Sequence, residues 1–339
     1  MPSPARPKVL GTGLVALDLV ISADPSRPIQ SWAGGTCGNV LSILAYLGWD
    51  SYPIARLNFD PAATRITADF QQWGVHLDFV HAGPTTSTPI IIQENVVTKA
   101  GVAKHKFTWA CPRCGSWLPA FRPITRDVLE TVTPAVEGTA VFFLDRLSRA
   151  ALTLADRAAE CGALVVFEPS GRSDPKLFAE AINIAHIVKY ADQRLSDAGG
   201  TMSDNTATLL EVQTLGSRGL RFRYKTEGVA SEWTELEAVP TEHVIDTCGS
   251  GDWCTAGMLS RLAAGGQGAF RSHSFDEVTN ALQYGQSLAA WNCGYEGARG
   301  GMYSGSQALL DSAHAVAHNA SLDAAEHLHL VSCPSCPPS

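Results

Sequence analysis

Several absences narrow the interpretation of this 339-residue sequence. No apolar run approaches the roughly 20 residues that cross a bilayer, and residues 1–8 lack the apolar core of a signal peptide. Basic residues (25) are fewer than acidic ones (33), and this balance disfavours a nucleic acid as partner. No Gly-Lys-Ser/Thr phosphate loop occurs, so the P-loop kinases are a poor match. We expect a cytoplasmic protein with neither a membrane nor a nucleic acid as partner.

The sequence does contain enough apolar material for a large core, since hydrophobic residues make up 45% and charged residues 17%. Residues 8–21 form a strand-like run that glycines interrupt. From about residue 127, apolar strand-like runs alternate with helical segments. Such alternation predicts an α/β fold, in which a mostly parallel sheet is covered by helices on both faces.

The most informative segment is 244–252, VIDTCGSGD, which leads directly into the helical run 253–259. Its glycines let the backbone turn tightly with N–H groups pointing one way. A helix that starts at this turn adds free N–H donors and a partial positive charge, which together can hold a phosphate. Beside such a site, Asp252 is suited to take the proton from a hydroxyl that attacks the phosphate. The alternative is an aspartate that only caps the helix.

Residues 246–252 closely resemble the signature Asp-Thr-x-Gly-Ala-Gly-Asp of the PfkB (ribokinase-like) carbohydrate and nucleoside kinases. Serine stands where that family usually has alanine. The resemblance implies catalytic roles for Asp252 as general base and for Gly249, Ser250 and Gly251 as an anion hole, and nucleotide-site roles for Asp246 and Thr247.

Further motifs of the same family imply an acceptor site. Gly34, Gly35 and Asn39 match Gly-Gly-x-x-x-Asn, whose backbone and amide grip the sugar, although glycines can also serve helix–sheet packing. Asp18 stands where the family has an aspartate that touches substrate hydroxyls. Asp60 matches the aspartate of the family's Gly-x-Asp-x-x-Gly motif, but other residues replace both glycines.

The nucleotide side is implied by two glycine-rich turns. Thr214, Gly216 and Gly219 match the Thr-x-Gly-x-x-Gly turn that lies against the nucleotide phosphates. The bend 294–300, which contains Gly297, resembles the adenine-pocket loop. ATP and Mg²⁺ are the implied cofactors, and a monovalent cation such as K⁺ is implied near Asp246.

One family motif is absent. Where Asn-x-x-Glu orients magnesium and its waters, this chain reads KYAD at 189–192, and Asp192 could substitute through a water. Residues 168–172, EPSGR, resemble the family's Asp-Pro-Asn-x-Arg with two conservative changes.

The resemblance covers most of the chain and implies a single ribokinase-like domain over residues 1–325. Strands within about 12–36 and 86–110 are expected to form a small β-sheet lid over the sugar. Residues 103–109 alternate like one strand of a hairpin. Lid sheets in this family often pair, which implies a homodimer. Residues 326–339 would form a tail.

The nine cysteines include two Cys-x-x-Cys pairs, and in a reduced compartment such pairs favour a four-thiolate zinc site over disulfides. Two unrelated pairs, or a disordered tail, are the alternatives. The proposed ligands of a structural zinc are Cys111, Cys114, Cys333 and Cys336.

Three functions follow as hypotheses. The first is an ATP-dependent kinase that phosphorylates a hydroxymethyl group of a sugar or nucleoside. The second is a catalytically impaired relative that binds nucleotide or sugar for regulation. The third, a zinc-ribbon nucleic-acid binder, is disfavoured by the acidic charge.

Overall fold

The computed structural model describes residues 5–98, 103–172, 174–196, 207–241 and 243–304. Ten strands of this part form the central sheet: β1 (Lys8–Thr12), β4 (Asp50–Leu57), β5 (Val80–Ala82), β8 (Val141–Leu144), β9 (Leu164–Phe167), β10 (Ile187–Ala191), β11 (Leu210–Thr214), β12 (Leu220–Thr226), β13 (Val229–Ala230) and β14 (Thr234–Leu236). Their order is β13-β12-β11-β10-β9-β8-β1-β4-β5, with β14 paired to β12. All pairs from β11 to β5 are parallel, and β12 pairs antiparallel with its neighbours, so the predicted mostly parallel sheet is confirmed.

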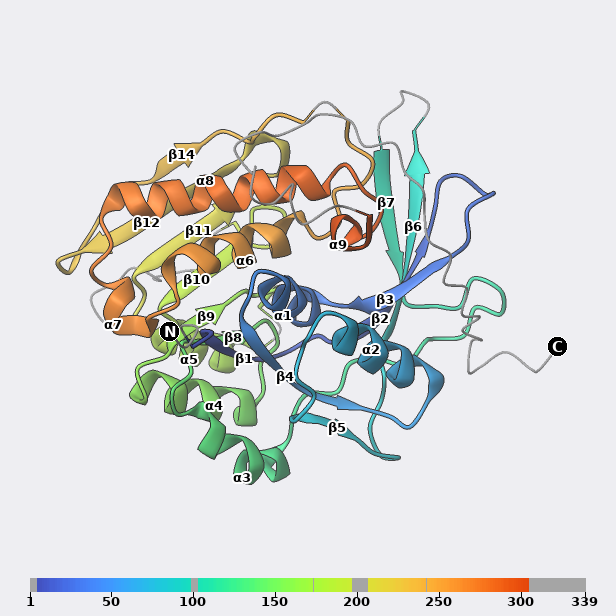
Figure 1. Cartoon of the computed structure of the whole chain (residues 1–339), viewed down its shortest axis with the longest axis horizontal. Helices are drawn as coiled ribbons and strands as arrows, with labels where there is room; N and C mark the ends of the chain where they lie inside the picture. The colour runs from blue at the N-terminus through green and yellow to red at the C-terminus, as the bar shows by residue number, and fades with distance from the viewer. Residues whose placement is uncertain (1–4, 99–102, 173, 197–206, 242, 305–339) are drawn as a thin grey trace.

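Helices cover both faces of this sheet (Figure 1). One face carries α1 (Thr36–Tyr46), α2 (Pro61–Gln72), α6 (Ser250–Leu262) and α8 (Phe275–Asn292), and the other carries α3 (Leu129–Val132), α4 (Arg149–Glu160) and α5 (Pro175–Ile184). Side chains of β8 alternate between the two cores: Phe143 packs in the first, Phe142 and Leu144 in the second. Burial on both faces explains why the central strands read as continuous apolar runs.

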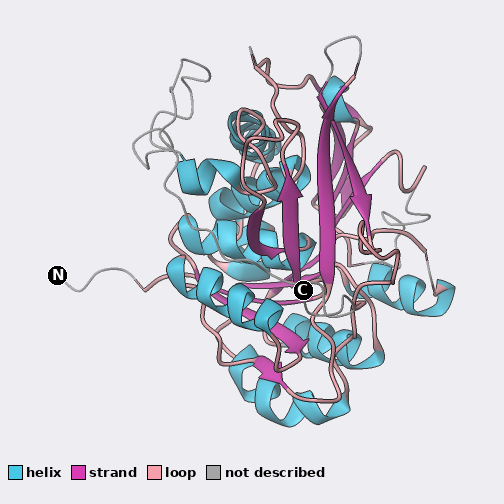
Figure 2. Cartoon of the chain, turned by 90° about the vertical axis from the view of Figure 1, so that its right-hand side faces the viewer, coloured by secondary structure: helices cyan, strands magenta, loops and turns pink. Residues whose placement is uncertain are grey.

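A second, separate sheet stands beside the first and faces the viewer in Figure 2. It contains β3 (Gln30–Gly34), β2 (Ala16–Ile21), β6 (Ile90–Val97) and β7 (Ala103–Thr108), in that order. The central pair β2–β6 is parallel, and the outer pairs are antiparallel. These four strands, called the small sheet below, fall within the predicted ranges 12–36 and 86–110, which confirms a small separate sheet.

The glycine-interrupted run 8–21 supplies strands to both sheets, β1 to the central sheet and β2 to the small sheet. Gly13 lies between β1 and β2 with φ 151°, a conformation that favours glycine. A Cβ at this position would lie 1.7 Å from Oδ1 of Asp145. Gly13 therefore lets the chain leave the central sheet and lets Asp145 approach the backbone, where its Oδ1 accepts from the amide of Leu14 (2.9 Å).

The division into a domain over 1–325 and a tail over 326–339 stays a prediction, because residues 305–339 lie outside the described part of the chain. Among the residues that are described, no helix combines the length and apolarity needed to cross a bilayer.

Helices α6 and α8 pack closely where two glycines face each other. A Cβ on Gly257 would lie 2.7 Å from Cα of Gly285, and a Cβ on Gly285 would lie 2.4 Å from the carbonyl oxygen of Cys254. Even a methyl group therefore forces the two backbones apart. Since α6 begins at the predicted phosphate turn, this contact helps to fix the position of that turn.

We expect Gly285→Ala to lower the free energy of unfolding by about 1–3 kcal/mol, the usual cost of overpacking a close contact. Urea unfolding measures this change. The matched control is Gly268→Ala in α7 (Gly266–Phe270), where a Cβ meets no atom within 4 Å. Alanine there should be neutral or stabilising by up to about 1 kcal/mol. Equal losses in both variants would contradict the packing argument.

Candidate active site

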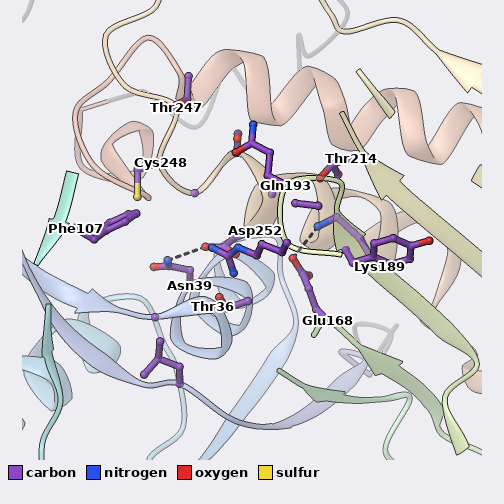
Figure 3. Close-up of a pocket in the computed structure, with 18 of the residues that line it drawn as sticks. Thr36, Asn39, Phe107, Glu168, Lys189, Gln193, Thr214, Thr247, Cys248 and Asp252 are labelled. Carbon is purple, nitrogen blue, oxygen red and sulfur yellow. Dashed lines mark hydrogen bonds and ion pairs between the residues drawn. The ribbon is translucent and has the colours of Figure 1, made fainter. Parts of the chain in front are cut away.

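A cavity of about 350 Å³ lies between the carboxyl ends of the central strands and the small sheet (Figure 3). Its floor includes Glu168 after β9, Lys189 on β10 and Thr214 on β11, and its other wall includes Phe107 on β7. Ligands of open α/β sheets bind at the carboxyl ends of the parallel strands. The structure brings the predicted turn 249–251 and Asp252 to this cavity.

The turn owes its shape to Gly249. This residue is the N-cap of α6 in the left-handed conformation (φ 74°), and a Cβ there would lie 2.2 Å from the carbonyl oxygen of Ala298. Within the described part of the chain, no side chain caps the helix. The Ser250 amide donates to the carbonyl of Thr247 (3.3 Å). The amides of Gly251 and Asp252 have no acceptor among the described residues, so they are available to an anion at the positive end of the helix dipole.

Asp252 lies in the first turn of α6 and faces the cavity. Its Oδ2 accepts a hydrogen bond from Nδ2 of Asn39 at 2.8 Å. Burial and the neighbouring Glu168 carboxylate raise the pKa of Asp252 to about 8, while the bond from Asn39 and the Lys189 ammonium act in the opposite direction. A carboxyl group with a raised pKa is a stronger base when it is ionised, as proton abstraction requires.

A chain of buried polar groups orients Asn39. Oδ1 of Asn39 accepts from Nε of Arg299 (3.1 Å), so its NH₂ group faces Asp252. Nη2 of Arg299 forms an ion pair with Oδ2 of Asp69 at 2.7 Å, and both side chains are buried. Tyr303 also donates to Asp69 (2.8 Å). The amide orientation at the cavity thus depends on a salt bridge behind it.

Asp18 presents an unpartnered oxygen. Among the described residues, its buried Oδ1 has no hydrogen-bond partner. Burial raises the pKa of Asp18 to about 7, while the charge of Arg299 and the Gly35 amide lower it. A Cβ on Gly34 would lie 1.9 Å from Oδ2 of Asp18, so glycine is needed beside this carboxyl group. Buried polar atoms normally have partners, and an orphan is a sign of a missing ligand.

The predicted site residues separate into two groups. Those that line the cavity are Asp18, Gly35, Asn39, Thr214, Gly216, Thr247, Gly249, Ser250, Gly251 and Asp252. Those outside its lining are Gly34, Asp60, Gly219, Asp246 and Gly297.

Two members of the second group have structural contacts of their own. Asp60 is the N-cap of α2, where its Oδ1 accepts from the amide of Ala63 (2.8 Å). Gly219 has φ 95°, and a Cβ there would lie 2.1 Å from the carbonyl oxygen of Leu236. Glycine at this position lets the turn after β11 lie against segment 236–238.

Asp246 connects the small sheet to the turn. Its buried carboxylate accepts from Gln93 and Asn95 of β6, and Nδ1 of His105 on β7 lies 3.3 Å from Oδ1. The amides of Cys248 (2.9 Å) and Gly297 (2.8 Å) also donate to it. Although burial acts to raise the pKa of Asp246, these hydrogen bonds and His105 lower it. The ionised carboxylate therefore joins two parts of the protein.

The predicted zinc site has only half of its ligands in the described residues. Cys111 is buried and Cys114 exposed, in a tight turn where the Gly115 amide donates to the Cys111 carbonyl (2.8 Å). Over the described residues, no three His, Cys, Asp or Glu side chains are grouped to hold a metal. Cys333 and Cys336 lie outside those residues, so the shared zinc stays an unsupported prediction.

No local pattern indicated a role for Asp69 and Arg299, because their contact joins segments 230 residues apart. Lys189 could have been identified from the sequence, because it is a lysine inside the apolar strand IVKYA. Buried lysines are rare unless they are paired.

The sequence comparison identifies the family. Residues 24–303 match the profile described as pfkB family carbohydrate kinase. The chain belongs to the pfkB family of carbohydrate kinases, which confirms the predicted family and enzyme class. A search of curated proteins found no match.

Solved structures of kinases share the fold. Fructokinase with bound ATP from Xylella fastidiosa has a TM-score of 0.66 and 19% identity, covering 86% of this chain and 93% of its own. Ribokinase from Giardia lamblia has a TM-score of 0.68 and 15% identity, covering 87% and 95%. Aminoimidazole riboside kinase from Salmonella enterica, complexed with aminoimidazole riboside and an ATP analog, has a TM-score of 0.64 and 20% identity, covering 91% and 98%.

We expect Asp246→Asn to loosen the small sheet, because a neutral amide cannot accept from all the donors around that carboxylate. Amide hydrogen exchange should become about tenfold faster or more in β6 and β7 while β1 and β8 change little. The control is Glu211→Gln on β11, a buried carboxylate that accepts from Tyr190 (2.6 Å) and Arg223 (2.7 Å) far along the central sheet. If exchange in β6 and β7 were unchanged in Asp246→Asn, the connection would not hold the sheet.

Proposed function

We propose that the protein is an ATP-dependent kinase that phosphorylates a hydroxymethyl group of a sugar or nucleoside. The observation that carries the proposal is the pairing of a raised-pKa carboxyl group, Asp252, with the 249–251 turn in one cavity, where no side chain caps the helix that the turn begins. Phosphoryl transfer needs positioning and charge stabilisation more than covalent chemistry from the protein. Membership of the pfkB family supports this reading.

ATP would lie along the Thr214–Gly219 turn and the 284–300 region. Thr214 and Gly216 line the same cavity as the 249–251 turn, which supports the first part of this placement. The γ-phosphoryl group would then sit at the 249–251 turn. There the amides would stabilise charge on its oxygens as the bond to the leaving oxygen breaks.

The acceptor would be held by Asp18, Gly35 and Asn39, with Gly34 shaping the pocket. The unpartnered Oδ1 of Asp18 can accept from a hydroxyl of the ligand. Phe107 and Trp109 line the cavity from the small sheet and can pack on a sugar or base ring. Closure of the small sheet as a lid would exclude water and so prevent hydrolysis of ATP. The predicted contact of Asp60 with the acceptor has no comparable support, since Asp60 caps α2.

Magnesium fits the cavity through oxygen ligands, which it prefers. Asp192 lines the cavity and would hold Mg²⁺ through water, although it also forms an ion pair with Arg218 at 3.1 Å. When bound, the ion neutralises charge on the phosphates. A monovalent cation near Asp246 finds its carboxylate already bonded by protein donors, and no step uses it. The homodimer through the small sheet stays a prediction.

A catalytically impaired relative remains the alternative, favoured by the missing Asn-x-x-Glu motif. Incubation with ATP, Mg²⁺ and a panel of sugars and nucleosides separates the two. Acceptor-dependent release of ADP supports the kinase. Nucleotide binding without any transfer across the panel would favour the regulatory protein.

We expect Asp252→Asn to reduce kcat by about 10²–10⁴-fold, the usual contribution of a general base, while nucleotide binding persists. The matched control is Asp276→Asn, because Asp276 also lies in the first turn of a helix, α8, but outside the cavity lining. Transfer assays and nucleotide titration measure both variants. Turnover near that of the unmodified protein in Asp252→Asn would rule out the mechanism.

The pH dependence follows from the same carboxyl group. The base must be ionised, so kcat/KM should rise with pH and level off above about 8, the pKa of Asp252. Asn39→Ala removes a hydrogen bond that lowers this pKa, so the midpoint should move to higher pH even if the rate falls. The profile is measured with a saturating second substrate. A rate that is flat from about pH 6 to 9 would contradict the assignment.

A further inference from the structure

Lys189 is a charged residue in an otherwise apolar strand of the central sheet. It lies on β10 between buried neighbours, and only 2% of its side chain is exposed. Nevertheless Lys189, the central residue of the strand, lines the cavity (Figure 3). A lysine is costly to bury because its ammonium loses hydration, so a buried lysine in a cavity wall calls for a charged partner.

The ammonium group of Lys189 lies under the phosphate turn. Nζ is 3.6 Å from the position that a Cβ on Gly251 would occupy. It donates to Oε1 of Glu168 at 2.8 Å. An ammonium has three N–H donors, and in the described residues this is the one hydrogen bond that Nζ makes to the protein. Two donors are therefore free for a ligand above them.

Two hydrogen bonds fix the carboxylate of Glu168 and, through it, the position of the Lys189 ammonium group. Its Oε1 accepts from Nζ, and its Oε2 accepts from the hydroxyl of Thr255 at 2.7 Å. Thr255 lies on α6, one helical turn after the phosphate turn. Glu168 therefore fixes the ammonium relative to α6, and its charge offsets that of Lys189.

The other cations near this end of the cavity are less suited to an anion at the turn. Two arginines line the cavity, Arg146 and Arg194. Arg146 is paired with Asp145 at 2.7 Å, on the side of the cavity toward Leu14, and the charge of Arg194 also acts on Asp145. The negative groups nearby, Glu168, Asp145 and Asp252, would repel an incoming phosphate. An anion at residues 249–251 thus needs a cation close to the amides, and Lys189 is placed there.

We propose that Lys189 is a phosphoryl-binding residue, whose ammonium donates to an oxygen of the terminal phosphoryl group of ATP from below the 249–251 turn. The inference rests on the proposed kinase function and deepens it. No bond to Lys189 forms or breaks: its fixed charge balances the charge on the transferring group while Asp252 takes the proton of the acceptor hydroxyl. A charged donor makes a shorter and stronger hydrogen bond than the neutral amides beside it.

The test compares the affinities for ATP and for ADP, because only ATP carries the terminal phosphoryl group. Isothermal titration with Mg²⁺ and without acceptor gives both dissociation constants. Lys189→Met keeps the length of the side chain and removes the charge. We expect it to weaken ATP binding about tenfold or more and ADP binding less than about twofold. Lys189→Arg, which keeps the charge, should restore part of the preference for ATP.

A control and a partner variant separate this role from a structural one. Lys8→Met alters another lysine with buried contacts, since Lys8 donates to the carbonyl of Ala135 on the far side of the sheet, and it should leave both affinities unchanged. Glu168→Gln frees Lys189 from its counter-charge, so the preference for ATP should be kept or increased.

The outcomes are distinct. Equal weakening of ATP and ADP in Lys189→Met, or no weakening of either, would overturn the proposal, since Lys189 would then serve only to pair with Glu168. If that occurs while the unmodified protein still transfers phosphate to an acceptor, the proposed kinase function stands without this inference. An unmodified protein that binds neither nucleotide would overturn both.

Discussion

Mutual repulsion among three carboxyl groups at the carboxyl end of the central sheet is the constraint around which the site is arranged. Each group has a different donor: Lys189 for Glu168, Arg146 for Asp145 and the amide of Asn39 for Asp252. The neutral amide stabilises a negative charge least. Burial raises the pKa of both Asp252, to about 8, and Asp145, to about 6. The Glu168 carboxylate adds to the rise at Asp252, which Asn39 and Lys189 oppose, whereas the Arg146 guanidinium opposes the rise at Asp145.

The local part of this arrangement was predictable from sequence. The turn at 249–251 and the helix after it follow from neighbouring residues, since glycine geometry and helix capping act over a few positions. Residues 244–247 before the turn also suggest a strand, but the structure has none there. The alternation of strand-like and helical segments after residue 127 likewise predicted the parallel sheet. Such features depend on interactions that a short window of sequence contains.

The parts that escaped prediction depend on contacts between distant segments. Arg299 orients Asn39 across 260 residues, and Asp246 meets β6 across about 150. No periodicity or composition encodes such a pairing. The departure at 189–192, visible in the sequence as a missing motif, becomes interpretable only when the fold places Lys189 beneath Gly251. The sequence KYAD in place of Asn-x-x-Glu removes one polar motif, and it also adds the positive charge of Lys189 to the cavity.

The carboxylate of Asp246 has a further consequence, because it is bonded at once to the small sheet and to the backbone two residues along, at Cys248. Any ligand that draws the small sheet inward must also move the segment that begins the anion turn. The two substrates would then be thermodynamically linked, each raising the affinity for the other through a shared displacement. In such a protein the anion turn would reach the geometry for phosphoryl transfer only when both substrates are bound. Transfer of the phosphoryl group to water would then be slow.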